Sequence, residues 1–332
     1  MIRKGKLSML LCGILTMSLL VGCGSSSDSN SDNVKNIGVL QLIQHSALDT
    51  ANEGFVDALK EAGYEDGKNI KIEQQNAQGK IDTAQQIANQ FVSSKKDLIF
   101  AIATPSAQAA YNATKDIPIV FTAVTDPVAD SLVKSLESSG NNLTGTSDMA
   151  DIEEQLELYT KVLPEMKTLG IIYTTSETNS VNQVKLLNEL APKFGLKVKE
   201  IGVANINEIN QNLTSAIKDI DALYAPTDNN VAASYELVAQ IALSNNVPVL
   251  GAEPAVVEVG GLICKGIDYY ELGKMAGDKA VQILEGKKPS EIPSETMPEL
   301  AITVNTDVAE KLGIVISDDI LKDANKVTGG VK

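Results

Sequence analysis

Residues 98–127 read LIFAIATPSAQAAYNATKDIPIVFTAVTDP, and this stretch decides the fold class. Residues 98–103 and 118–124 are almost continuously apolar, whereas 105–114 has the mixed pattern of a helix. A continuous apolar run is typical of a parallel strand that is buried on both faces. The stretch therefore predicts a strand, a helix and a second strand of one parallel sheet, with short polar side chains where each strand ends.

The same alternation extends in both directions along the chain. Strand-and-helix units of this length indicate an α/β fold with doubly wound parallel sheets. Further strands are expected at 37–40, 69–74, 168–174, 196–203, 221–225, 247–250 and 300–304. Further helices are expected at 46–62, 81–94, from about 128, 152–163, 178–191, 207–218, 229–244 and 269–285. Ser46 with Asp49, Asp151 with Glu154, and Asp268 with Glu271 match the capping-box pattern at helix starts.

The units fall into two series, each of the size of one domain, so we expect two lobes. The join over 142–148 is short and compact, and segments left over at the C-terminal end can complete either lobe. We expect an N-terminal lobe of 36–145 plus about 268–300, and a C-terminal lobe of 146–267 plus about 301–326. Two α/β lobes joined by several strand crossings form a hinged pair with a cleft.

Composition excludes several classes of function. The 332 residues include 28 Lys and Arg against 43 Asp and Glu, a formal net charge of −15. Such a surface repels phosphate backbones and anionic lipids, so no nucleic-acid partner is expected. His45 is the single histidine, which excludes a multi-histidine metal site. Phosphate-binding glycine loops and the Gly-x-Ser-x-Gly pattern are absent, so we expect no metal, no cofactor and no enzyme activity.

The N-terminus has the pattern of an export signal. Three basic residues among the first six precede an uncharged run over 7–21. The run ends in Leu20-Val-Gly-Cys23, which resembles the bacterial lipobox, whose cysteine is acylated. The alternative is an ordinary signal peptide with an incidental cysteine. We expect a lipoprotein signal peptide over 1–22 and a polar, disordered tether over 23–35.

Short polar side chains gather after the strands of both series, and this is the edge where open α/β sheets bind ligands. Helix N-termini at that edge suit a carboxylate, and acidic side chains beside them suit an ammonium. The alternative is that these side chains only cap helices. Glu253 is an exception because glutamate is a poor cap. His45 could line the cleft or lie on the surface, while Tyr269 and Tyr270 are expected to pack in the interior.

The chain resembles the extracytoplasmic solute-binding proteins of ABC importers, which have the type I periplasmic-binding fold. Within that group it is similar to the TrpX-like ABC transporter substrate-binding lipoproteins, which are associated with aromatic amino acids. The likeness covers about residues 36–325. It is carried by residues 37–41, 45–49, 103–107, 125–128, 142–148, 173–180, 226–229, 257–261 and 266–270.

The resemblance implies a clamp that closes on an amino acid and presents it to a membrane permease. By position, Thr104, Ser106 and Thr125 would hold the ligand carboxylate, and one or more acidic residues would pair with its ammonium. Side chains after the strands of the second lobe would close over the ligand. The full set of expected ligand-binding residues is Gln41, Thr104, Ser106, Thr125, Asp126, Ser147, Asp148, Ser176, Asn179, Ser180, Asp228, Asn229 and Glu253, with Cys23 as the lipidation site.

These features predict a monomer that is lipid-anchored at the extracytoplasmic face of a bacterial membrane. It would deliver an amino acid, an aromatic one such as tryptophan, tyrosine or phenylalanine, to an ABC importer. Alternatives are a branched amino acid, a nucleoside or a sugar as ligand, or a surface adhesin or sensor that uses the same clamp.

Overall fold

The computed structural model describes residues 34–330; the predicted signal peptide, Cys23 and nearly all of the predicted tether lie outside the described residues. Val34–Lys332 are grouped as one compact unit, separate from the residues before them. Three clusters of buried apolar side chains lie within this unit. Because it has its own cores, we expect this part of the chain to fold by itself.

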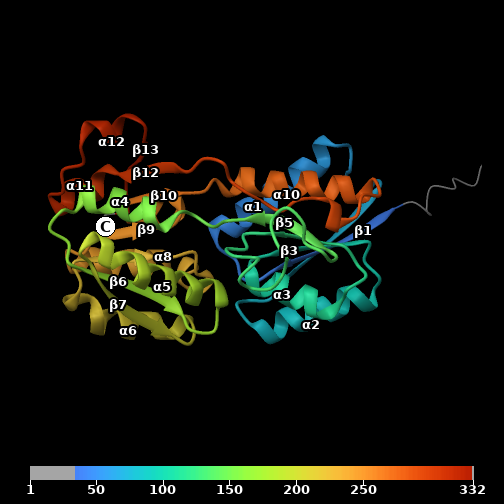
Figure 1. Ribbon diagram of the computed structural model, residues 1–332, viewed down its shortest axis with the longest axis horizontal. Coiled ribbons are helices and arrows are strands. Elements are labelled where there is room, and N and C mark those ends of the chain that lie inside the picture. Colours follow the sequence, from blue (N-terminus) through green and yellow to red (C-terminus); the bar gives the residue numbers. More distant parts are fainter. Residues whose placement is uncertain (1–33, 331–332) are drawn as a thin grey trace, which may run out of the picture. The chain divides into compact units, whose positions relative to one another are not determined.

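The first sheet consists of parallel strands in the order β11-β5-β4-β3-β1-β2 (Figure 1). β3 and β4 are fully buried, as expected of central strands between two helix layers. Its strands are β1 (Lys35–Gln41), β2 (Ile70–Asn76), β3 (Leu98–Ile102), β4 (Ile119–Thr122), β5 (Leu143–Ser147) and β11 (Glu295–Thr296).

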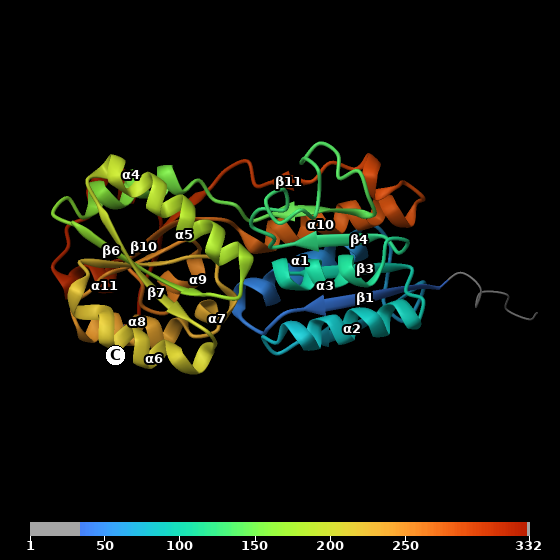
Figure 2. The ribbon, with the colours of Figure 1, turned by 60° about the horizontal axis from the view of Figure 1, so that its bottom comes forward.

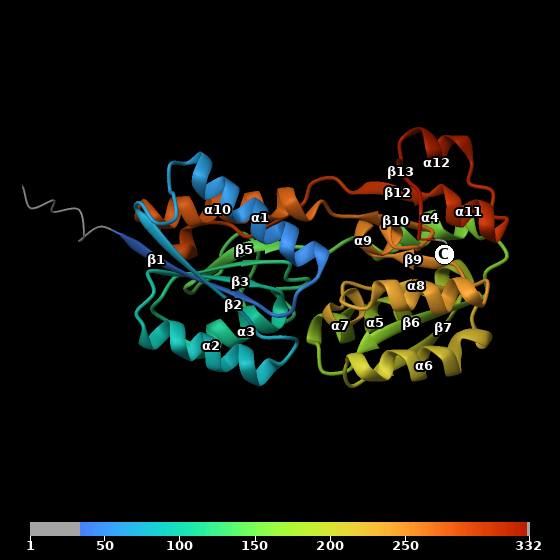
Figure 3. The same ribbon diagram turned by 180° about the vertical axis from the view of Figure 1, so that it is seen from behind.

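Helices cover both faces of the first sheet. α2 (Ile81–Ser93) and α3 (Thr104–Ala113) lie on one face, and α1 (Ser46–Glu61) and α10 (Tyr269–Leu284) lie on the other (Figure 3). α1 and α10 pack backbone against backbone. A Cβ atom on Gly273 would lie 2.0 Å from the carbonyl oxygen of Ala51, so only glycine permits this approach.

The second sheet has the order β13-β12-β10-β9-β8-β6-β7. Its neighbouring strands are parallel except β10 and β12, which pair antiparallel. The central strands β8 and β9 are short, apolar and fully buried, whereas β7 at the edge is only partly buried. The strands are β6 (Thr168–Thr174), β7 (Lys197–Val203), β8 (Ala222–Ala225), β9 (Val249–Gly251), β10 (Ile263–Gly266), β12 (Ala301–Asn305) and β13 (Asn325–Val327).

Two apolar clusters flank the second sheet, one on each face. Figure 2 shows α4 and α5 on one side and α6 and α8 on the other. The helices are α4 (Ile152–Val162), α5 (Thr178–Leu190), α6 (Ile209–Ala216), α7 (Asn229–Ala232), α8 (Tyr235–Ser244), α9 (Pro254–Glu258), α11 (Thr306–Leu312) and α12 (Asp318–Lys322). Short 3₁₀ turns occur at Ala191–Phe194, Ile206–Glu208, Ile217–Asp219 and Pro289–Glu291.

The chain passes between the two sheets at three places. The first crossing leads from β5 to α4, the second from β10 to α10 and the third from β11 to β12. In each case the second element packs on or pairs with the other sheet. Two doubly wound lobes joined by several strand crossings are the predicted fold class, and this prediction is confirmed.

Two helix predictions fail where a local signal interrupts the pattern. No helix begins near residue 128; residues 127–142 form turns, with Ser131 at φ +57°. The Asp126 carboxylate accepts hydrogen bonds from the backbone N–H groups of Val128 and Ala129, which closes a turn instead of a helix. The predicted helix 229–244 is divided into α7 and α8, which are separated by Ala233 and Ser234.

The predicted helix caps have mixed outcomes. Asp151 and Asp268 each accept hydrogen bonds from two backbone N–H groups in the first turn, so both act as N-caps. The capping box at Ser46 and Asp49 is wrong. His45 holds the N-cap position without a side-chain bond, and Asp49 accepts a hydrogen bond from Gln41 Nε2 at 2.7 Å.

Candidate functional site

The site lies where the strands of both sheets end. Ala103 and Ala123, which follow β3 and β4, have φ values of +83° and +53°. An alanine rarely adopts a positive φ, and such strain concentrates at functional sites because the surrounding structure must maintain it. The backbone is therefore unusual at two neighbouring strand ends, and Ala123 lines a cavity between the lobes.

The cavity has a volume of about 10 Å³, which is about the space that one water molecule needs. Both lobes contribute to its wall, and none of the lining residues is a lysine or an arginine. Three carboxyl groups face it instead. The lining residues are His45, Leu48, Ala123, Asp148, Asn179, Thr227, Asp228, Asn229, Ala232, Glu253 and Tyr269.

Hydrogen bonds connect the lobes beside this cavity. The hydroxyl oxygens of Thr125 and Thr227 lie 3.1 Å apart. Gln108 Nε2 donates to Thr178 Oγ1 at 3.1 Å. Polar groups from both lobes therefore meet directly around the cavity.

Asp148 follows β5 and has an unused carboxylate oxygen. Its Oδ2 accepts a hydrogen bond from the hydroxyl of Tyr269 at 2.7 Å, while its buried Oδ1 has no partner. Burial raises the pKa of the Asp148 carboxyl above its usual value, and the bond from Tyr269 opposes that rise. One oxygen is thus fixed by the protein and the other is available to a ligand.

The α3 N-terminus carries a second group of unused polar atoms. Thr104 Oγ1 and Ser106 Oγ are buried and have no hydrogen-bond partner. Their helix begins after β3, and Ala103 N–H donates to the carbonyl of Thr122 in the next strand. Unpaired N–H groups of the first turn and two free hydroxyls make this helix end suitable for an anion.

Asp228 is held by the protein itself. Its carboxylate accepts hydrogen bonds from Thr174 N at 2.5 Å, Thr174 Oγ1 at 2.9 Å, Ser180 Oγ at 2.7 Å and Val231 N at 2.9 Å. Val231 N–H belongs to the first turn of α7, so Asp228 is an N-cap and also joins three segments of the second lobe. Burial raises the pKa of its carboxyl.

Glu177 extends this network. It accepts hydrogen bonds from the backbone and side-chain N–H groups of Asn229, at 3.2 and 2.5 Å, and from Asn230 Nδ2 at 3.3 Å. Burial and the nearby charge of Asp228 raise the pKa of Glu177 to about 8. These bonds orient Asn229, which lines the cavity together with His45.

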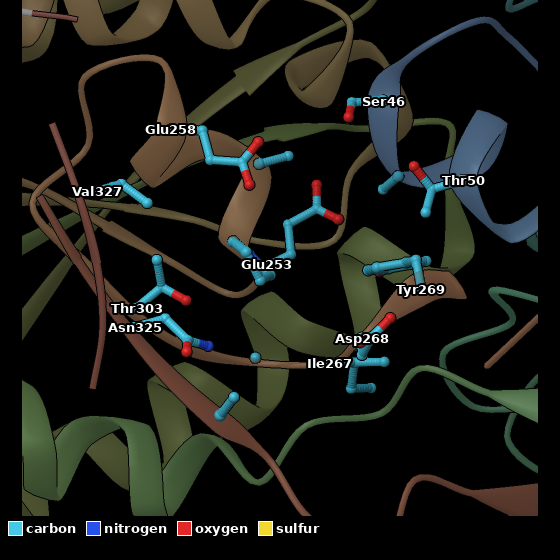
Figure 4. Close-up of a pocket in the computed structure, with 15 residues that line it drawn as sticks. Ser46, Thr50, Glu253, Glu258, Ile267, Asp268, Tyr269, Thr303, Asn325 and Val327 are labelled. Atoms are coloured by element: carbon cyan, nitrogen blue, oxygen red, sulfur yellow. The ribbon is translucent and has the colours of Figure 1, made fainter. Parts of the chain in front are cut away.

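Glu253 separates the small cavity from a larger pocket. The pocket has a volume of about 370 Å³ and shares Glu253 and Tyr269 with the cavity. Figure 4 shows the carboxylates of Glu253 and Glu258 in the same space, across from Ser46 and Thr50. Tyr235 donates its hydroxyl to Glu253 Oε1 at 2.6 Å, and burial raises the pKa of Glu253 to about 7.

The raised pKa of Glu253 makes its contribution to stability depend on pH. The pKa of Glu253 is about 7 in the folded protein and 4.5 in the unfolded chain. The folded state therefore binds the proton more tightly, which stabilises the fold fully below pH 4.5, and this stabilisation is lost as the pH rises to 7. Glu253→Gln cannot ionise. Its free energy of unfolding should therefore equal that of the natural protein near pH 4.5 and exceed it by about 3 kcal/mol at pH 7.5.

Urea unfolding of both proteins at pH 4.5, 6 and 7.5 measures this difference. Because the two proteins are compared at the same pH, the contributions of other titrating groups to the free energy of unfolding cancel. Glu258→Gln, an exposed change on the same helix, is the matched control and should show no such trend. A difference for Glu253→Gln that stays constant with pH would show that Glu253 titrates as a solvated carboxyl.

The remaining predicted residues lie around the cavity rather than in it. Gln41 Nε2 donates to Ile43 O and Asp49 Oδ1. Ser147 donates to the carbonyl of Thr125 at 2.8 Å, and Ser180 donates to Asp228. Ser176 is exposed, and Asp126 holds its own turn. The structure therefore gives these five side chains internal or solvent contacts, and places Asp148, Asn179, Asp228, Asn229 and Glu253 in the cavity wall.

Four side chains of the site were not among the predicted residues: Glu177, Thr227, Tyr235 and Tyr269. The expectation that Tyr269 only packs is wrong, because it lines the cavity and donates to Asp148. Tyr235 likewise donates to Glu253. Thr227 had a signal in the sequence, because it lies in the segment 226–229 that carries the family resemblance. The two tyrosines had none, because Tyr235 lies 18 residues from its partner Glu253 and Tyr269 lies 121 residues from its partner Asp148.

Within residues 34–330 no group of His, Cys, Asp and Glu side chains is arranged to hold a metal ion. Over the same residues, no helix has the length and apolar character needed to cross a bilayer. Cys264 is buried, and burial raises the pKa of its thiol to about 12.

A family model described as ABC transporter substrate binding protein matches residues 36–328. The chain belongs to this family. It is 48% identical to the tyrosine-binding protein of Clostridioides difficile (strain R20291) over 94% of this chain and 93% of that protein. The predicted resemblance to substrate-binding proteins of ABC transporters is thereby confirmed.

Solved structures of similar proteins include one with a bound amino acid. The ABC domain in complex with L-Trp from Streptococcus pneumonia is 37% identical, with a TM-score of 0.86 over 89% of this chain and 99% of that one. A ligand-free, open substrate binding protein with adhesive properties from Clostridium difficile is 49% identical, with a TM-score of 0.68 over the same shares of both chains. The Clostridium difficile protein has the higher identity but the lower TM-score. The two lobes of the present chain are therefore arranged more as in the L-Trp complex than as in the open structure.

Proposed function

We propose that this substrate-binding protein binds an aromatic amino acid between its lobes and delivers it to an ABC importer, without chemical turnover. The observation that carries the proposal is the buried interface between the lobes. There, unpaired acceptors at Asp148 and Asn179 line the cavity, and the unpaired hydroxyls of Thr104 and Ser106 lie at the start of α3, after β3 of the first sheet. A zwitterion complements such a pair of sites. The relatives' ligands, tyrosine and L-Trp, favour an aromatic side chain.

The α3 N-terminus is the proposed carboxylate site. Thr104 and Ser106 supply free hydroxyls, and the helix supplies first-turn N–H groups and a partial positive charge. Asp148 is the proposed partner of the ammonium because its Oδ1 is free, whereas Asp228 already accepts four hydrogen bonds. Carboxylate and ammonium would then sit at the ends of β3 and β5, on either side of β4 in the first sheet.

Binding would work by a shift between open and closed lobes. A whole aromatic amino acid is much larger than the cavity of about 10 Å³, so side chains at the interface must rearrange around it. Shifting an open-to-closed ratio from 99:1 to 1:99 needs about 5.5 kcal/mol of differential binding. A few charge-assisted hydrogen bonds of about 1.5–3 kcal/mol each can supply this.

Calorimetry with a ligand series tests the proposal on the part of the chain from Val34 onward. L-Tyrosine, L-tryptophan or L-phenylalanine should bind, while tyramine, which lacks the carboxylate, and 3-(4-hydroxyphenyl)propionate, which lacks the ammonium, should bind at least tenfold more weakly. Leucine, uridine and glucose represent the alternative ligand classes. Binding of one of these, with no response to any aromatic amino acid, would replace the proposed ligand.

Anchoring by an acylated Cys23, after removal of residues 1–22 and through a tether over 23–35, completes the proposal. It rests on the sequence pattern and on the family, whose members serve membrane importers. In the same proposal the N-terminal lobe comprises 36–145 and about 268–300, and the C-terminal lobe comprises 146–267 and about 301–326. In a bacterial host, Cys23→Ser should move the protein from the membrane fraction to the soluble fraction, and unchanged fractionation would argue against lipid anchoring.

Adhesion is a second candidate function. The 49% identical relative from Clostridium difficile is described as having adhesive properties. Immobilised protein that retains host cells or matrix, with or without bound amino acid, would support adhesion alongside ligand binding. A lack of retention would leave the transport role alone.

A further inference from the structure

The cavity between the lobes is surrounded by three unpaired hydrogen-bond acceptors. The buried atoms Asp148 Oδ1, Asn179 Oδ1 and His45 Nε2 have no partner, and all three residues line the cavity. His45 and Asp148 follow strands of the first sheet, and Asn179 lies on α5, which packs on the second sheet. Buried polar atoms without partners are uncommon in folded proteins, and three acceptors around one small cavity suit a ligand that donates hydrogen bonds.

Internal contacts fix the acceptor character of the Asn179 and Asp148 atoms. Asn179 Nδ2 donates to the carbonyl of Thr227 at 2.8 Å, which directs Oδ1 the other way. Asp148 Oδ2 is occupied by Tyr269, which leaves Oδ1.

The ring of His45 completes the set. Burial lowers the pKa of His45 to about 4, so the ring is neutral near pH 7 and carries a single N–H. With this proton on Nδ1, the buried and unpartnered Nε2 is an acceptor.

From this arrangement we infer that the three acceptors form a cage for a primary ammonium, with one N–H directed to each of Asp148, Asn179 and His45. An ammonium has three donors, carries the positive charge that the cavity wall lacks, and is close to a water molecule in size. The inference rests on the proposed function and deepens it by adding His45 and Asn179 to the ammonium site. Because the acceptors belong to both lobes, the ammonium would favour the closed arrangement.

The first experiment does not depend on an aromatic ligand. His45 is the single histidine of the chain, so ¹⁵N NMR of untagged, histidine-labelled protein gives one unambiguous ring signal. Methylammonium chloride at millimolar concentrations should shift the Nε2 resonance in the direction of an accepted hydrogen bond. Tetramethylammonium chloride, which has the same charge but no N–H group, should not.

The second experiment combines changes in ligand and protein. N-Methylation of L-tyrosine removes one donor and should weaken binding at least tenfold. Asn179→Leu should also weaken binding of L-tyrosine at least tenfold, but in this variant N-methylation should have a much smaller effect, because the two changes remove the same hydrogen bond. Asn188→Leu, an exposed change on the same helix, should behave as the natural protein does.

The outcomes separate the two proposals. A His45 signal that responds to methylammonium, with no binding of any aromatic amino acid, would support the cage and overturn the proposed ligand. Tight binding of L-tyrosine with an unmoved Nε2 resonance, or equal effects of N-methylation in the natural protein and in Asn179→Leu, would overturn the cage.

Discussion

Replacing Asp148 with asparagine is expected to weaken the binding of the aromatic amino acid by about 2–5 kcal/mol, which is roughly a thirtyfold to several thousandfold loss. The change keeps the shape of the side chain and an oxygen acceptor, but it removes the negative charge. In the natural protein Tyr269 holds Oδ2 at 2.7 Å and leaves the buried Oδ1 free for the ligand. An ammonium that is buried against a neutral amide loses its charge partner, and in a cavity wall without lysine or arginine this loss is largely unscreened.

Calorimetry with L-tyrosine measures this loss, and Asp126→Asn is the matched control. Asp126 also follows a strand of the first sheet, but it is partly exposed and its Oδ1 accepts from Val128 and Ala129 in its own turn. We expect affinity to change less than threefold in the control. If Asp148→Asn folds normally and binds L-tyrosine as tightly as the natural protein does, the ammonium is held elsewhere, and Glu253 becomes the leading candidate.

The contrast between Asp148 and Asp228 shows what the sequence can and cannot predict about the site. Both aspartates follow a strand of a parallel sheet, and for both the sequence left ligand binding and helix capping open. The structure distinguishes them by their partners. Asp228 accepts bonds from Val231, three residues away, but also from Thr174 and Ser180, about 50 residues away. Such distant partners leave no pattern in the local sequence.

The fold was more predictable than the site because its signals are local. The apolar run over 98–103 and the helical spacing after it depend on neighbouring residues alone, and β3 and α3 form as expected. The errors occur where a side chain finds a non-local or competing partner. Asp49 bonds to Gln41 instead of capping α1, and Tyr269, although it packs in the core, also donates to Asp148. Sequence patterns thus locate the strand ends, while contacts between distant residues determine which side chains remain free to bind.

Asp228→Ala is expected to lower the free energy of unfolding by about 3–5 kcal/mol, because it removes the acceptor for four buried hydrogen bonds at once. The change would leave the N–H groups of Thr174 and Val231 and the hydroxyl of Ser180 unpaired in the interior. Burial raises the pKa of the Asp228 carboxyl, and the removal of this desolvated group offsets part of the loss. The net effect should remain large because the unpaired donors are also buried.

Asp151→Ala in the same lobe is the control. It separates the stability lost with a helix cap from the stability lost when buried donors are left unpaired. Asp151 caps α4 through the N–H groups of Glu153 and Glu154, but it is exposed, so its loss should be limited to about 1 kcal/mol. Urea unfolding of the two variants measures the difference between them. If Asp228→Ala proves as stable as Asp151→Ala and yet loses affinity for L-tyrosine more than thirtyfold, Asp228 contacts the ligand directly. If instead Asp228→Ala is strongly destabilised, Asp228 is a structural residue that holds α7 and the end of β6 in place, and Asp148 remains the acidic residue available to the ligand.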